Sequence, residues 1–95
     1  MRRVAANIVY INNIEFYKNY IVELYEHIVV NRYQLKEELE MTEWLGGTIL
    51  LYKRKAYHIN KVLSSEEVNE IYSTLSSSSE LSTDYSCSYG NIKRL

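Results

Sequence analysis

Residues 3–35 alternate with a period of two, and isoleucine, valine and tyrosine dominate them. In an extended strand, this period sends successive side chains to opposite faces of a sheet. Asn12-Asn13 interrupts the pattern, and asparagine tolerates the positive φ of a tight hairpin turn. Glu26-His27 is a second interruption. The pattern therefore predicts three consecutive strands joined by short turns, at 3–11, 14–25 and 28–35.

The second of these strands contains an irregularity. Lys18 falls on the apolar parity, so Lys18-Asn19 predicts a bulge or a break between two short strands. A helix over 14–26 is the alternative, because several apolar residues there fall near helical spacing. The β-forming composition and the missing helix cap favour the strand.

Two further strands are expected after a charged connection. Residues 36–43 carry four glutamates and predict a loop or one helical turn rather than sheet. Gly46-Gly47 allows a backbone turn before the compact apolar strand at 48–52. Lys53-Arg54-Lys55 is a polar turn, after which 56–59 returns as a strand.

One helix follows the strands. Ser64 precedes Glu67 by the spacing of a capping box, in which each residue bonds the backbone of the other. An apolar stripe at helical spacing continues from there, formed by Val68, Ile71, Tyr72 and Leu75. Residues 77–95 are serine-rich and predict a mobile tail. The sequence therefore predicts one β-rich α+β domain over 1–76, with an antiparallel sheet of about five strands, a C-terminal amphipathic helix and a flexible tail.

The size and charge of the chain exclude several classes of function. The chain has 95 residues with 11 basic and 12 acidic side chains, so its net charge of −1 creates no general attraction to nucleic acid or anionic lipid. No apolar run approaches the roughly 18 residues of a membrane span. The single Cys87 forms no internal disulfide, so we expect a cytoplasmic protein without membrane contact.

Residue spacings typical of catalytic and metal sites are missing from the sequence. A zinc site needs about four ligands, and His27, His58 and Cys87 show no such spacing. The glutamates of 36–43 lack the spacing of a calcium loop, and the serines lack a nucleophile motif. We therefore expect no enzyme activity, no metal and no cofactor.

The ten tyrosines are the most unusual part of the composition. Tyrosine suits half-buried sheet positions, and it also suits protein interfaces because it combines contact area with a polar tip. A thin sheet filled by tyrosine and a partner surface are equally favoured interpretations. The first functional hypothesis is a non-catalytic interaction or structural module that forms a homodimer or binds another protein. Its candidate surface comprises Tyr17, Tyr25, Tyr33, Trp44, Tyr52 and Tyr57.

The alternative hypothesis is a nucleic-acid-binding module. Aromatic residues flank the basic turn 53–55, and this mixture is typical of proteins that bind single strands. The candidate contacts are Arg32, Lys53, Arg54, Lys55 and Lys61. A turn kept soluble by its charge explains the same residues, and the small net charge favours that interpretation, so nucleic acid is the less expected partner.

Three segments also carry a family resemblance: 7–13, then 22–24 with 28–30, and 44–50. Their order, two hairpins and a charged connection leading into a Gly-Gly strand, resembles the small N-terminal β-structure of amidohydrolase-superfamily enzymes. In that family a metal-binding His-x-His follows the Gly-Gly strand and opens a barrel, whereas Leu51-Tyr52-Lys53-Arg54 occupies that place here. The resemblance therefore implies a detached β-module without the barrel, the metal ligands or hydrolase activity.

Overall fold

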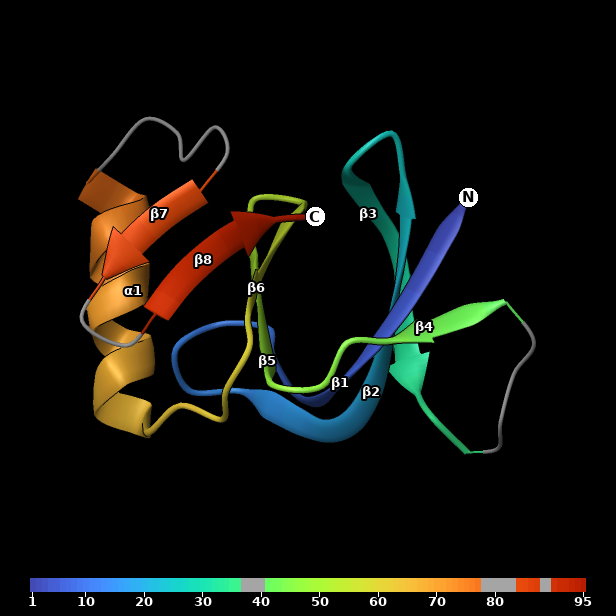
Figure 1. Ribbon diagram of the computed structural model, residues 1–95, viewed down its shortest axis with the longest axis horizontal. Helices are drawn as coiled ribbons and strands as arrows, with labels where there is room; N and C mark the ends of the chain where they lie inside the picture. Colours follow the sequence, from blue (N-terminus) through green and yellow to red (C-terminus); the bar gives the residue numbers. More distant parts are fainter. Residues whose placement is uncertain (37–40, 78–83, 88–89) are drawn as a thin grey trace.

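The computed structural model describes residues 1–36, 41–77, 84–87 and 90–95. Within these residues, one curved sheet lies beside a single helix (Figure 1). The elements in chain order are β1 (Arg2–Tyr10), β2 (Phe16–Tyr25), β3 (Ile28–Gln34), β4 (Thr42–Trp44), β5 (Thr48–Tyr52), β6 (Lys55–Ile59), α1 (Ser65–Ser77), β7 (Asp84–Cys87) and β8 (Gly90–Arg94).

The sheet is mixed rather than antiparallel. Seven strands follow the order β3-β2-β1-β5-β6-β8-β7, and β4 pairs with β1 off this path. The hairpins are antiparallel as expected, but β4 and β5 both run parallel to β1. The β-rich α+β class is confirmed, and the expectation of about five antiparallel strands is only roughly right. Local alternation predicts strands, but it does not encode the direction of pairing between strands distant in sequence.

β1 bends at Asn7. Before the bend, residues 3–5 pair with β4, and after it, residues 8–10 pair with β5. Val4 and Ala6 face the core inside the curved sheet, but beyond the bend Val9 takes that side. The simple alternation expected for 3–11 therefore changes parity at the bend. β2 is irregular at Asn19, which lies opposite Asn7. Asn19 has a φ of 50° although it lies inside one continuous strand. The irregularity predicted at Lys18-Asn19 is thus a single strained residue.

Gly47 fixes the start of β5 against the bend of β1. Its N–H donates to Asn7 Oδ1 at 2.8 Å, and its carbonyl accepts from Ile8 N at 3.3 Å. Gly47 has a φ of +61°, and an added Cβ would lie 2.3 Å from the Ile59 carbonyl oxygen. Only glycine fits this conformation and this close approach.

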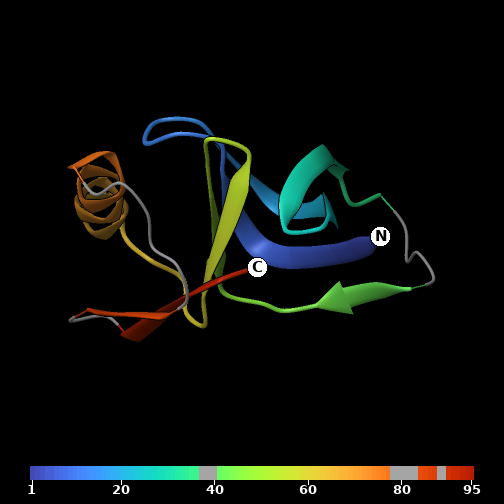
Figure 2. The same cartoon turned by 90° about the horizontal axis from the view of Figure 1, so that it is seen from above.

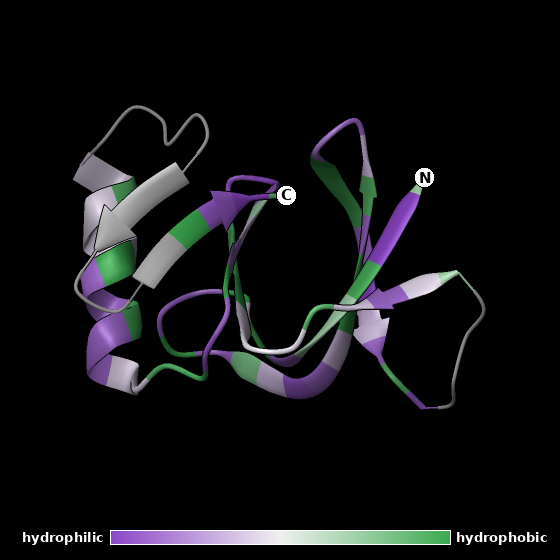
Figure 3. Ribbon diagram, viewed as in Figure 1, coloured by the Kyte–Doolittle hydropathy of each residue, from purple (hydrophilic) through white to green (hydrophobic). Residues whose placement is uncertain are grey.

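Two cores lie on opposite faces of the β5–β6 hairpin. The first fills the concave side of the sheet and includes Val22, Ile49 and Leu51. The second lies between the outer side of β5, β6 and β8 and the helix, and includes Leu50, Tyr57 and Ile71. Figure 3 shows the apolar bands of α1 on its side toward β8. Adjacent residues of β5 therefore pack into different cores. Because both faces of the strand are buried, its sequence is apolar without interruption.

The curvature brings β3 back to the β5–β6 turn. Val29 N donates to the Arg54 carbonyl at 2.7 Å, and Figure 2 shows the two hairpins approaching each other. Leu95 fixes the same region, because its N–H donates to Ala56 O at 2.9 Å and its oxygen accepts from His27 Nδ1 at 2.7 Å. The described strands thus curl around the first core.

The helix forms as its sequence predicts. Ser64 N donates to Glu67 Oε1 at 2.9 Å, and Glu67 N donates to Ser64 Oγ at 3.3 Å. This reciprocal pair confirms the capping box. The apolar stripe faces the second core, so the predicted packing of the helix on the sheet is confirmed as well. In the described part of the chain, no helix is long and apolar enough to cross a membrane.

Two expectations differ from the structure. Thr42 and Glu43, at the end of the charged segment 36–43, form β4 beside β1 together with Trp44, although sheet was not expected there; 37–40 lie outside the described residues. Residues 84–87 and 90–94, within the predicted mobile tail 77–95, pair as a hairpin on β6 with Ile92 buried, whereas 78–83 and 88–89 lie outside the described residues. The serine-rich composition did not indicate this backbone pairing or the burial of Ile92 and Leu95.

Candidate binding pocket

A large open pocket lies where four parts of the chain converge. The β1–β2 loop, β3, the β5–β6 turn and one side of α1 line it, and its volume is about 1150 Å³. Ile11, Val29 and Leu51 supply apolar surface continuous with the concave core. These residues come from loop and strand segments that are remote in sequence, so the pocket exists only because the sheet curls.

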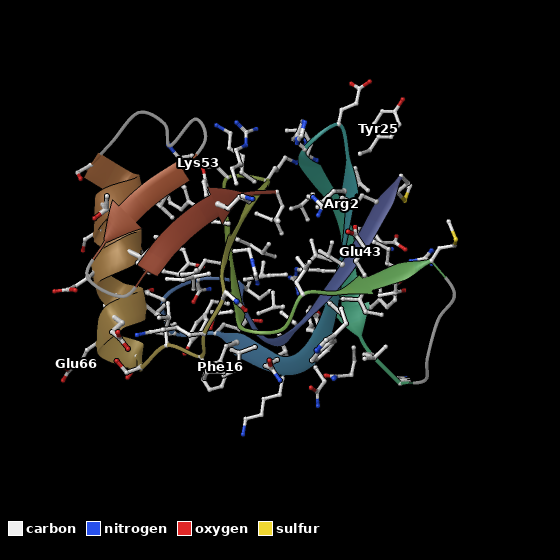
Figure 4. All side chains as sticks on the ribbon, viewed as in Figure 1. Arg2, Phe16, Tyr25, Glu43, Lys53 and Glu66 are labelled. Atoms are coloured by element: carbon white, nitrogen blue, oxygen red, sulfur yellow. The ribbon has the colours of Figure 1, made fainter. Side chains whose placement is uncertain are left out.

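The charged residues that line the pocket, within the described part of the chain, are all positive. Arg32, Lys53 and Arg54 line it, and Figure 4 shows Lys53 at the tip of the β5–β6 hairpin. Among the residues that the structure describes, no aspartate or glutamate lines this pocket. Asn12 and Asn31 add amide groups, which donate and accept hydrogen bonds. A protein of net charge −1 thus concentrates three cations in one place.

Lys53 and Arg54 occupy a strained turn. They are the two loop residues between paired Tyr52 and Lys55, with φ angles of 49° and 65°. Positive φ at both positions of a two-residue loop defines a type I′ turn, which favours Asn-Gly. Glu26-His27 at the β2–β3 turn is strained in the same way, with φ angles of 49° and 69°. Residues whose side chains disfavour this conformation therefore occupy both turns. These turns lie next to the hydrogen bond from Val29 N to the Arg54 carbonyl, which joins the two hairpins.

A bulge in β3 forms part of the opposite wall. The pairing register shifts between Glu23 and Leu24, where Asn31 and Val29 are their partners. Val30 is therefore the extra residue, and it lines the pocket with 51% of its surface exposed. Bulges re-aim side chains and are common beside functional sites.

Aromatic side chains border the pocket at the helix. Lys53 Nζ lies 5.4 Å from the centroid of Tyr52, whose ring lies 6.2 Å from that of Tyr72. Tyr72 Oη is within 2.9 Å of Leu51 O and 3.2 Å of Tyr10 O, and it donates its one proton between these carbonyls. Burial raises the pKa of Tyr72, so the hydroxyl stays neutral and fixes the helix wall.

A second aromatic group adjoins Arg32. Its Nη1 donates to Tyr20 Oη at 3.1 Å, and the Tyr20 ring stacks on Tyr17 with centroids 4.7 Å apart. Tyr17 in turn donates to Glu15 Oε2 at 2.6 Å. Sequence reasoning missed the role of Tyr20, because its contact with Arg32 depends on the pairing of β2 with β3.

The predicted tyrosine surface is divided by the fold. Tyr57 is 2% exposed within the second core, so it is not part of an exposed surface. Tyr25 is 56% exposed at the tip of the β2–β3 hairpin (Figure 4). Tyr52 lines the pocket, whereas Tyr17 is not among the lining residues and is linked to Arg32 only through its stack on Tyr20. Tyr33 and Trp44 share a row across β3, β2, β1 and β4, and Trp44 is 54% exposed.

Tyr33 is held by a polar cluster on the outer side of the sheet. Its hydroxyl donates to Glu23 Oε2 at 2.7 Å, and Arg3 Nε donates to the same oxygen at 2.9 Å. Glu23 is only 8% exposed. The hydrogen bonds from Tyr33 and Arg3 lower the pKa of Glu23. This arrangement stabilises a buried carboxylate and leaves the Tyr33 hydroxyl occupied.

The predicted nucleic-acid contacts are brought together only in part. Arg32, Lys53 and Arg54 line the same pocket. Lys55 begins β6, and Lys61 lies near the start of α1, where its Nζ is 3.8 Å from Glu67 Oε2. The structure therefore brings three of the five residues together in one cationic group, and Lys55 and Lys61 are not among the pocket-lining residues.

The histidines make backbone contacts away from the pocket lining. The Nε2 of His58 donates to Gly46 O at 3.0 Å, and burial lowers the pKa of this half-buried ring. His27 bonds Leu95 as described above. Across the described ranges, no group of three or more histidine, cysteine, aspartate or glutamate side chains gathers as a metal site would require. Glu37, Glu38 and Glu40 lie outside these ranges.

No protein-family model, curated protein or solved structure matches the chain. The resemblance of residues 6–51 to the amidohydrolase N-terminal module therefore stays a prediction from the sequence. Charge, apolar surface and aromatic rings converge at one pocket. This convergence is the observation that best indicates a function.

Proposed function

We propose that this chain is a small non-catalytic binding module whose pocket takes a phosphate-bearing anionic ligand. One observation carries the proposal: Arg32, Lys53 and Arg54 surround an apolar floor, and the described lining contains no carboxylate. Arginine and lysine are the residues that recognise phosphate, arginine by paired hydrogen bonds and lysine as a point charge. A cytoplasmic location, expected from the single cysteine, belongs to the same proposal.

The backbone supports a functional interpretation of these charges. A turn that only joined β5 to β6 would be more stable with Asn-Gly than with Lys53-Arg54. Residues held at unfavourable φ cost of order 1 kcal/mol each and cluster at ligand sites. The strained cations and the bulge at Val30 flank the same pocket, which is the pattern expected where the backbone is shaped for a ligand.

Calorimetric titration with tripolyphosphate tests the proposal. We expect saturable binding to the wild-type chain, and loss of binding in K53Q/R54Q because two of the three pocket cations are removed. The variant K18Q/K36Q removes two charges from exposed residues outside the pocket, and it should bind like the wild type. Equal loss in both variants, or no binding by the wild type, would contradict the proposal.

A second candidate function is protein interaction through the aromatic residues of the outer face, including homodimerisation. Trp44 favours it, because this large side chain is 54% exposed on the short strand β4, and the neighbouring Met41 is exposed too. Aromatic residues and methionine are enriched at protein interfaces. Light scattering across a dilution series should show a dimer that W44S weakens. A strict monomer at every concentration would count against homodimerisation.

A further inference from the structure

One cation of the pocket, Arg32, contacts a pair of stacked aromatic rings that adjoins the pocket lining. Arg32 lines the pocket and also donates to Tyr20, which carries Tyr17 in a nearly parallel stack with an interplanar angle of 15°. Tyr20 is buried in the concave core, whereas Tyr17 reaches the surface. A fixed ring beside a guanidinium offers a stacking platform for a planar group next to a phosphate contact.

The dimensions of the pocket favour an extended ligand. Its volume of about 1150 Å³ exceeds the range of about 300–1,000 Å³ that is usual for small-molecule pockets. It is open, and it runs from α1 past the β5–β6 turn to β3. A chain-like ligand has room to lie across these elements, with successive charged groups meeting Lys53, Arg54 and Arg32.

We infer that the phosphate-bearing ligand is a single-stranded nucleic acid, with phosphates at the pocket cations Arg32, Lys53 and Arg54 and a base stacked on Tyr17. This inference rests on the proposed function and specifies its ligand. Stacking on an aromatic ring requires an unpaired base, so a duplex would leave Tyr17 without its contact. An acidic phosphopeptide would engage the cations, but its backbone provides no planar ring in a regular series.

The salt dependence of binding gives a quantitative test. For single strands, the slope of log affinity against log salt is about −0.7 for each phosphate neutralised, so three cations predict a slope of about −2. Affinity for oligo(dT) of about 12 nucleotides should therefore fall about 20-fold between 50 and 200 mM salt. In K53Q/R54Q the slope should shrink to about −0.7. Fluorescence anisotropy with a labelled oligonucleotide measures both slopes.

Variants of Tyr17 test the stacking. Y17A should weaken oligo(dT) binding by at least about fivefold, the lower end of the range for a stacked base. Y17F keeps the ring and should restore the affinity, although it loses the bond to Glu15. The matched control Y25A removes an exposed tyrosine that is not part of the Tyr17–Tyr20 stack beside Arg32, and it should bind like the wild type.

The same measurements separate failure of this inference from failure of the proposed function. If tripolyphosphate binds but oligo(dT) does not, the phosphate pocket stands and the nucleic-acid inference is overturned. Equal affinity for oligo(dT), for an abasic oligonucleotide and for the matching duplex would also overturn it, as would tighter binding of an acidic phosphopeptide. If neither polyphosphate nor oligo(dT) binds the folded chain, both proposals fail.

Discussion

At the scale of residues, a few side chains and one glycine hold the curved sheet in place. Gly47 allows β5 to approach Ile59, and Glu23 joins Arg3 to Tyr33 across three strands. The sequence indicated the Gly pair as a turn before a strand, but it gave no sign of the close approach. The contacts of Glu23 were equally hidden, because they depend on the register between β1, β2 and β3.

The two glycines should respond differently to substitution. In G47A the new Cβ would meet backbone at 2.3 Å, so we expect a loss of several kcal/mol or failure to fold. In G46A the nearest atom is 3.5 Å away, and only the positive φ is penalised, by about 1–2 kcal/mol. Urea unfolding of both variants measures the difference. Equal losses would mean that the approach to Ile59 is not tight.

The Glu23 cluster predicts a pH dependence of stability. The pKa of Glu23 is lowered in the folded chain, so its contribution is complete above the ordinary pKa of 4.5 and is lost as the pH falls below it. Y33F should cost about 1–2 kcal/mol at neutral pH and flatten this acid limb. Thermal unfolding between neutral and acidic pH measures both effects. Y25F is the control, and an unchanged limb in Y33F would contradict the assignment.

At the scale of elements, sequence patterns succeeded where the structure is local. The meander β1–β2–β3, the β5–β6 hairpin and the capped helix each form from contiguous residues, and turn or cap signals mark their ends. β4 was missed because three residues in a glutamate-rich segment show no period. The β7–β8 hairpin was missed because serine dominates the segment and the burial of Ile92 depends on α1.

The β8 strand provides the element-scale prediction. Ile92 is 1% exposed and packs with Val68, Ile71 and Leu75 of α1, so I92A should destabilise the chain by about 2–4 kcal/mol. K93A, at the exposed neighbouring position, should change stability by less than about 0.5 kcal/mol. Urea unfolding compares the two. A neutral I92A would mean that residues 90–95 behave as the mobile tail that their composition predicts.

At the scale of the whole molecule, the curl of the sheet creates the pocket. Arg32 and the Lys53-Arg54 turn were recognisable in the sequence as candidate anion contacts, but nothing placed them at one site. Their convergence requires the bond from Val29 to the Arg54 carbonyl and the parallel pairing of β1 with β5. Both are long-range pairings, which alternation and composition do not specify. The sequence could therefore indicate which residues contribute to the candidate site, but not how they are arranged.

Lys53-Arg54 is, on the proposed function, retained for binding at a cost in stability. The variant K53N/R54G tests this most directly, because it gives the β5–β6 turn its preferred sequence while it removes two pocket cations. We predict that thermal unfolding shifts upward, corresponding to a gain of about 1 kcal/mol, and that calorimetry detects no tripolyphosphate binding. If the variant binds tripolyphosphate as well as the wild type, or is less stable than the wild type, Lys53-Arg54 is not retained for binding at a cost in stability.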